Sequence, residues 1–82
     1  MKLPRDLSGQ SLVKHLTKHW GYRQVHQVGS HIILQTQDPS PHRIAISAHS
    51  QLRIGTLNAI LAAIGTHKNV AKEEIVKNIR NL

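Results

Sequence analysis

The chain has 82 residues, enough for one compact domain with a single hydrophobic core but too few for two. It contains no cysteine, which excludes disulfides, zinc–thiolate sites and thiol nucleophiles. Eleven Lys and Arg against four Asp and Glu give a formal net charge of +7, so the expected partner is a polyanion, with nucleic acid first. A basic domain without nucleic-acid function is the alternative that charge alone leaves open.

Hydrophobic residues make up 39% of the chain and recur in short periodic segments, which predicts a folded protein over residues 1–82 with its core in about 8–65. No segment approaches the roughly 20 apolar residues of a membrane span, and the first nine residues do not resemble a signal peptide. We therefore expect no membrane association and a cytoplasmic location.

The first predicted element is an amphipathic helix. Ser8 is suited to cap its start, and Gly21 is suited to end it. Lys14 and Lys18 fall on the side opposite the apolar stripe. The stripe recurs at helical spacing and consists of Leu12, Val13, Leu16 and Trp20.

Two strands are predicted next, over residues 22–28 and 31–37. The Gly29–Ser30 pair between them fits a two-residue hairpin turn. A loop over residues 38–41 precedes a third strand over 43–48, in which Ile44 and Ile46 share one side.

Two helices are predicted in the remainder of the chain. Thr56 is suited to cap a helix that ends at Gly65, and a further helix is predicted over about 69–81. The apolar residues expected on one face of this last helix are Ile75, Val76, Ile79 and Leu82. The predicted fold class is α+β, in the order α-β-β-β-α with an extra C-terminal helix. Helices are expected on one face of a three-stranded antiparallel sheet, leaving its other face free for a ligand.

The hairpin turn predicts which side chains share a face of the sheet. It places Val28 opposite His31, Gln27 opposite Ile32, His26 opposite Ile33, and Val25 opposite Leu34. The residues expected on the helix-covered face are Val25, Ile32 and Leu34, and those expected on the free face are Gln24, His26, His31, Ile33 and Gln35. His26 and His31 would then be diagonal neighbours on a mostly polar face.

Two histidines on an exposed face of a basic protein suit metal-free RNA cleavage. One imidazole would remove the proton of the ribose 2′-OH while a second acid protonates the leaving oxygen. The carboxylates are too scattered to hold catalytic magnesium, so no metal and no cofactor is expected: Asp6, Asp38, Glu73 and Glu74. From the pattern alone, however, a surface histidine in a hairpin is more often just a polar strand residue.

Three short motifs stand out: the Gly21–Tyr22 pair, the Gly-Ser-His hairpin at Gly29–His31, and the Gly-Thr-Leu-Asn-Ala-Ile-Leu stretch over residues 55–61. In these motifs the chain resembles the HicA (YcfA-like) family of mRNA interferase toxins. The resemblance extends from about Leu12 to Gly65. It implies a fold like that of a double-stranded-RNA-binding domain, endoribonuclease activity on mRNA, and a HicB-type antitoxin as the protein partner.

By the same resemblance, His31 is the catalytic residue. Family members often carry Arg where this chain has His26, and Pro where it has Ser47. These departures leave the second proton-transfer group open between His26 and His49. They also leave two alternatives open, namely a non-catalytic RNA-binding module and a degenerate toxin that acts only through protein contacts.

Further residues are expected to contact RNA through charge or hydrogen bonds. These are Lys14, Lys18, Arg23, Ser30, Arg43, Arg53 and Thr56. Trp20 is expected in the core rather than in base stacking. His15 and His19 are one helical turn apart and are interpreted as helix-surface residues rather than metal ligands. The oligomeric state is left open.

Overall fold

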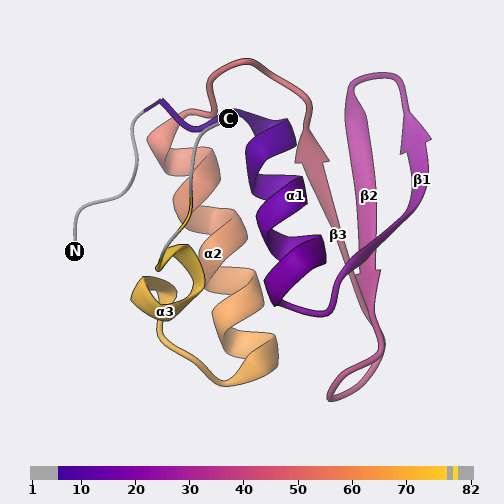
Figure 1. Cartoon of the computed structure of the whole chain (residues 1–82), viewed down its shortest axis with the longest axis vertical. Coiled ribbons are helices and arrows are strands. Elements are labelled where there is room, and N and C mark those ends of the chain that lie inside the picture. Colours follow the sequence, from indigo (N-terminus) through magenta and orange to yellow (C-terminus); the bar gives the residue numbers. More distant parts are fainter. Residues whose placement is uncertain (1–5, 78, 80–82) are drawn as a thin grey trace.

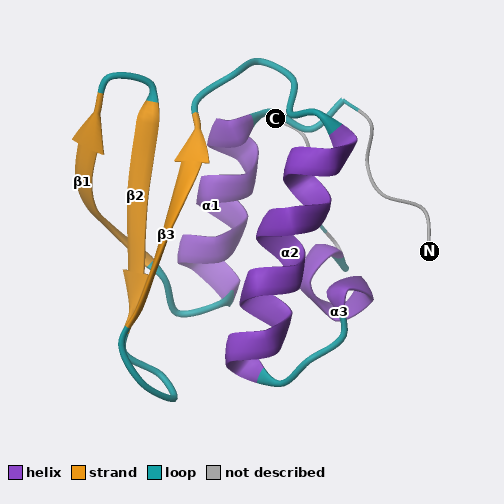
Figure 2. Cartoon of the chain, turned by 180° about the vertical axis from the view of Figure 1, so that it is seen from behind, coloured by secondary structure: helices purple, strands orange, loops and turns teal. Residues whose placement is uncertain are grey.

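The computed structural model describes residues 6–77 and 79, and it shows a three-stranded antiparallel sheet with the helices packed to one side (Figures 1 and 2). The elements in chain order are α1 (Gly9–His19), β1 (Arg23–Val28), β2 (His31–Thr36), β3 (His42–Ser47), α2 (Ile54–Lys68) and α3 (Lys72–Val76). The sheet order is β1-β2-β3. The predicted α+β class and its α-β-β-β-α order with an added helix are confirmed.

Helix α1 begins and ends where its flanking residues predict. The Ser8 Oγ accepts a hydrogen bond from the Ser11 backbone N–H at 3.0 Å, which satisfies one of the free donors of the first turn. Gly21 follows the helix with a φ of +72°, a conformation that favours glycine because it has no Cβ.

The β1–β2 hairpin turns at Gly29 and Ser30, as predicted. Gly29 has a φ of +57°, and Val28 pairs directly with His31 across the turn. The predicted pairs of Gln27 with Ile32 and of His26 with Ile33 are also confirmed.

The predicted register is wrong at the start of β1, because a β-bulge lies between Gln24 and His26. The bulge inserts Val25 as an extra residue, so Leu34 pairs with Gln24 rather than with Val25. Gln24 therefore shares the helix side of the sheet with Leu34, and Val25 is 38% exposed instead of buried under the helices. Arg23, which pairs with Gln35, moves to the free face.

The core lies between one face of the sheet and the helices. The sheet contributes Ile32, Leu34 and Ile46, and the two longer helices contribute Leu12, Leu16, Leu57, Leu61 and Ile64. Burying an aliphatic side chain of this size stabilises the folded state by about 1.5–3 kcal/mol. The helices are therefore held on this face, and the opposite face of the sheet is left uncovered.

Helix α2 differs from its prediction at both ends. Arg53 occupies the N-cap position, and Thr56 lies inside the first turn rather than capping it. The helix continues through Gly65 to Lys68, and Asn69 closes it in the left-handed conformation with a φ of 57°. A Cβ at Gly65 would approach the Val70 carbonyl oxygen to 2.7 Å, so this glycine permits a close approach of the following chain instead of ending the helix.

The C-terminal helix is much shorter than predicted. Helix α3 begins at Lys72 and ends at Val76, and its Ile75 side chain is fully buried. The predicted apolar face is confirmed at Ile75, which lies in the core, and at Val76 and Ile79, which pack against it, but the predicted helical extent was wrong. Its last member, Leu82, lies outside the described residues.

Within the part of the chain that the structure describes, no helix combines the length and apolarity needed to cross a membrane.

Candidate active site

His31 is the first residue of β2, and its side chain is exposed. The hairpin places it there, because Gly29 and Ser30 reverse the chain directly before it. The alternating strand residues Ile32 and Leu34 face the helices, so His31 points to the uncovered face. An imidazole in this position is open to a large ligand such as RNA.

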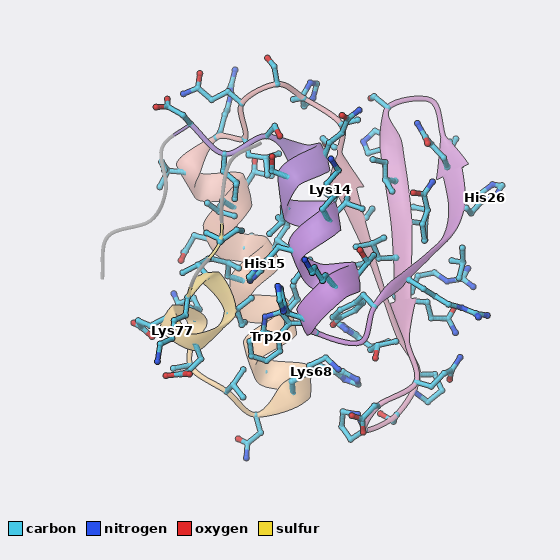
Figure 3. The ribbon with its side chains drawn as sticks, viewed as in Figure 1. Lys14, His15, Trp20, His26, Lys68 and Lys77 are labelled. Atoms are coloured by element: carbon cyan, nitrogen blue, oxygen red, sulfur yellow. The ribbon has the colours of Figure 1, made fainter. Side chains whose placement is uncertain are left out.

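The uncovered face carries positive and polar side chains around a small apolar strip. Strand by strand it consists of Arg23, His26 and Val28, then His31, Ile33 and Gln35, then Arg43, Ala45 and Ser47. The Arg43 guanidinium donates two hydrogen bonds to the Gln35 Oε1, at 3.1 and 2.8 Å, which fixes its position beside the central strand. Figure 3 shows His26 at the outer edge of the sheet, pointing away from the helices.

His31 has chemically different neighbours on its two sides. On β1 its partner is Val28, which is 58% exposed. On β3 its partner is Ser47, whose hydroxyl is polar and half-buried. A charged ligand beside His31 is therefore better accommodated on the Ser47 side.

Ser47 also lines a surface hollow of about 490 Å³ between the end of β3 and the start of α2. The hollow is lined by Ser47, His49, Ser50, Gln51, Leu52, Arg53 and Thr56. Two backbone hydrogen bonds hold this loop against its neighbours: Ala48 N–H donates to the Ser30 carbonyl at 2.7 Å, and Gly9 N–H donates to the His49 carbonyl at 2.9 Å. The hairpin tip, the loop after β3 and the start of α1 lie at the same end of the molecule (Figures 1 and 2).

The structure divides the site residues predicted from the sequence into three groups. Those gathered at the hairpin end are Ser30, His31, His49, Arg53 and Thr56. Those on the uncovered face further along the strands are Arg23, His26 and Arg43. The third group, Lys14 and Lys18, is exposed on α1, a separate surface from the open face of the sheet (Figure 3 labels Lys14).

His15 is buried, which corrects its interpretation as a helix-surface residue. Its Nε2–H donates a hydrogen bond of 2.7 Å to the Ile75 carbonyl oxygen, so it attaches α3 to α1. Burial lowers the pKa of His15, the hydrogen bond to Ile75 opposes this shift, and the neighbouring His19 adds to it. The half-buried Trp20 packs against the core, as predicted.

A second cluster of ring side chains lies at the opposite end of the sheet, and the sequence analysis did not identify it. The His42 and His67 rings stack with centroids 4.2 Å apart, and the Tyr22 hydroxyl shares a hydrogen bond of 3.0 Å with His42 Nδ1. Desolvation, with the charges of His67 and Lys68, lowers the pKa of His42. Burial raises the pKa of Tyr22. The signal available for His42 was its position two residues before Ile44, which places it on the helix side of β3.

Among residues 6–77 and 79, no three His, Cys, Asp or Glu side chains gather closely enough to hold a metal ion. His15 and His19 are in ring contact, with centroids 5.1 Å apart, but His15 is bonded to Ile75. The polar side chains that line the hollow near the hairpin carry imidazole, hydroxyl, amide and guanidinium groups.

The fold and the site together define a small basic α+β protein with an uncovered cationic sheet face and an exposed imidazole at its hairpin tip. A family model described as the HicA toxin of bacterial toxin–antitoxin systems matches residues 9–66, more than half of the chain. The chain therefore belongs to the HicA toxin family. Comparisons with curated proteins and with solved structures found no match. The match includes the hairpin, the loop after β3 and the start of α2, and it ends before α3.

Proposed function

We propose that this protein is an mRNA-cleaving endoribonuclease that needs no metal ion, with His31 as a catalytic residue. The observation that carries the proposal is the exposed imidazole of His31 on the uncovered sheet face, at the hairpin of a chain that belongs to a toxin family. The resemblance at Gly29–His31 supports the same residue.

The chemistry at the hairpin end suits transesterification of RNA. An imidazole titrates near neutral pH, so it can remove the proton of the ribose 2′-OH or protonate the leaving oxygen. Cleavage then produces a 2′,3′-cyclic phosphate and a 5′-hydroxyl end, and the reaction that forms them does not require a bound metal.

The charge distribution supports RNA as the substrate. The net charge of +7 attracts a polyanion, and Arg23 and Arg43 lie on the same face as His31. Both are cross-strand partners of Gln35, so their guanidinium groups are suited to bind backbone phosphates of the RNA on one side of the cleaved bond, further along the strands from His31.

Membership in a toxin–antitoxin family supports an inhibitory protein partner, and we propose a HicB-type antitoxin that covers the face with His31. Because mRNA is the proposed substrate, we propose that the toxin acts in the cytoplasm.

The test is a cleavage assay on RNA in the presence of EDTA, with the purified protein and its His31→Ala variant. Loss of a positioned proton-transfer group should lower the rate about 10²- to 10⁴-fold. Because His31 is exposed, the variant should keep the circular dichroism spectrum and thermal midpoint of the parent. Equal cleavage by both proteins would eliminate the proposed role of His31.

The same assay separates the two alternatives. A non-catalytic RNA-binding module would bind RNA in a salt-sensitive manner and leave it intact. A degenerate toxin would neither cleave RNA nor arrest growth when expressed, whereas the proposed enzyme arrests growth unless His31 is replaced.

A further inference from the structure

We propose that His49 is the second proton-transfer group, and that the phosphate being cleaved lies over Ser47, between His31 and His49. This inference rests on the proposed function and selects one partner for His31 among the histidines of the chain.

The first argument is the backbone geometry around Ser47. Ser47 is the direct cross-strand partner of His31, and His49 follows it by two residues. The Ala48 N–H donates a hydrogen bond to the Ser30 carbonyl oxygen, the Gly9 N–H donates one to the His49 carbonyl oxygen, and together they hold both sides of this pair in place. The bond to His49 uses its carbonyl oxygen, and the imidazole of this residue is exposed.

The second argument is the shape required by the reaction. In the in-line attack of the 2′-oxygen, the leaving 5′-oxygen departs on the opposite side of phosphorus. The base and the acid must therefore stand on two sides of a space that holds a phosphate. Ser47, His49 and Arg53 line a hollow that offers such a space, and His31 stands outside its lining, next to Ser47 on the neighbouring strand.

The third argument is the polarity of the two sides of His31. His26 is its diagonal neighbour at the outer edge of the sheet, on the side where the apolar Val28 is exposed beside His31. On the other side, the Ser47 hydroxyl and the Arg53 guanidinium are suited to bind a phosphate oxygen. A phosphate is therefore better stabilised between His31 and His49 than between His31 and His26.

In the proposed step the two imidazoles act on the two oxygens at the cleaved phosphate. One imidazole takes the proton of the 2′-OH while the 2′-oxygen forms a bond to phosphorus, and the bond from phosphorus to the 5′-oxygen breaks. The other imidazole, protonated beforehand, gives its proton to that 5′-oxygen. The two histidines end with their protonation states exchanged.

The test measures cleavage of a short RNA by the whole protein and by its His49→Ala, His26→Ala and His19→Ala variants. His49→Ala should lower the rate about 10²- to 10⁴-fold. His19→Ala is the matched control, because it removes an exposed imidazole on α1 far from the hollow and should stay within a few-fold of wild type. His26→Ala should lie closer to the control than to His49→Ala.

Two readouts distinguish proton transfer from mere positioning. The wild-type rate should depend on pH as a bell, and His49→Ala should lose one limb of that curve. In addition, an RNA with sulfur in place of the 5′-oxygen has a leaving group that needs little protonation, because thiols are far stronger acids than alcohols. This substrate should rescue one of the two variants, His31→Ala or His49→Ala, and leave the other impaired.

Wild-type activity of His49→Ala would overturn the inference. The inference would also be overturned if His49→Ala were impaired but kept both limbs of the pH–rate curve, and if the sulfur-containing RNA changed its rate no differently from that of His31→Ala. A larger loss for His26→Ala than for His49→Ala would also overturn it. All these outcomes leave the proposed function intact if His31→Ala is inactive, whereas an active His31→Ala would contradict the proposed function itself.

Discussion

Single residues at the hairpin end connect the proposed chemistry to the packing beneath it. His31 is exposed because it alternates with the buried Ile32, and the loop with His49 is held by a backbone bond from Gly9. Gly9 begins α1 at a point where the helix approaches the end of β3 without room for a side chain. The position of His49 therefore depends on Gly9, a residue without a side chain that could take part in the reaction.

Gly9→Ala should destabilise the protein although alanine is the better helix former. A Cβ at this position would collide with the carbonyl oxygen of Ser47, and overpacking of this kind lowers the free energy of unfolding by about 1–3 kcal/mol. Urea unfolding followed by circular dichroism measures the effect.

The matched control is Gly55→Ala, near the start of α2. No atom of residues 6–77 or 79 lies close to the Cβ that the substitution would add, so the expected change is a stabilisation of about 0.4–1 kcal/mol. A Gly9→Ala variant with the urea midpoint of the parent or a higher one would contradict the expected collision with Ser47.

Helix α3 shows how an element too short to be stable alone is held by its neighbours. It has five residues, whereas isolated helices shorter than about 12 residues are marginal in water. It is attached by the buried Ile75 side chain, by the bond from His15 to the Ile75 carbonyl, and by the Lys72 ammonium bond to the Asn58 Oδ1 at 2.9 Å. The family match ends at residue 66, so α3 lies outside the matched residues.

His15→Ala should loosen α3 and leave the sheet unchanged. The substitution removes the donor to the Ile75 carbonyl and leaves a gap beside α1, which should lower stability by about 1–3 kcal/mol. Amide hydrogen exchange should show faster exchange within residues 72–76 than in the parent protein. Lys14→Ala, which removes an exposed side chain from the same helix, should leave this exchange rate nearly unchanged.

For the molecule as a whole, acidification has opposite effects on RNA attraction, which depends on the cationic surface, and on fold stability, which depends on the buried histidines. The net charge of +7 attracts RNA, and protonated histidines would increase that attraction. His15 and His42 are packed so that their neutral forms are favoured, since burial lowers the pKa of each. Acidification therefore strengthens the attraction for polyanions while it weakens the fold.

The free energy of unfolding should accordingly fall as the pH drops below about 6.5, the ordinary pKa of histidine. Above that pH both states are neutral at these two positions. Below it the unfolded chain binds protons that the folded His15 and His42 resist, so stability is lost progressively toward their lowered folded pKa values. Urea unfolding at pH 8 and at pH 5.5 measures the difference.

A His42→Gln variant should show a smaller loss between these two pH values than the parent, because it removes one of the two groups. The substitution also removes the stacking partner of His67 and the neighbour of Lys68, which changes stability at any pH. The loss at pH 5.5 is therefore measured for each protein relative to its own stability at pH 8. An unchanged pH dependence in this variant would show that His42 does not contribute.

Local chemistry was enough to predict the element order, the cap at Ser8, the turn at Gly29 and the exposure of His31, since each depends on neighbours within a few residues. The assignment of His31 as catalytic came from the resemblance and stays a prediction. The end of α2 was misplaced because Gly65 resembles a stop signal, although its role is to admit Val70.

Contacts between residues far apart in the chain settled the rest, because no local pattern encodes them. The bulge at Val25 shifted Arg23 to the open face, and Ile75 drew His15 into the interior. Most important for function, the pairing of His31 with Ser47 brought His49 to the hairpin, although His31 and His49 lie far apart in the sequence.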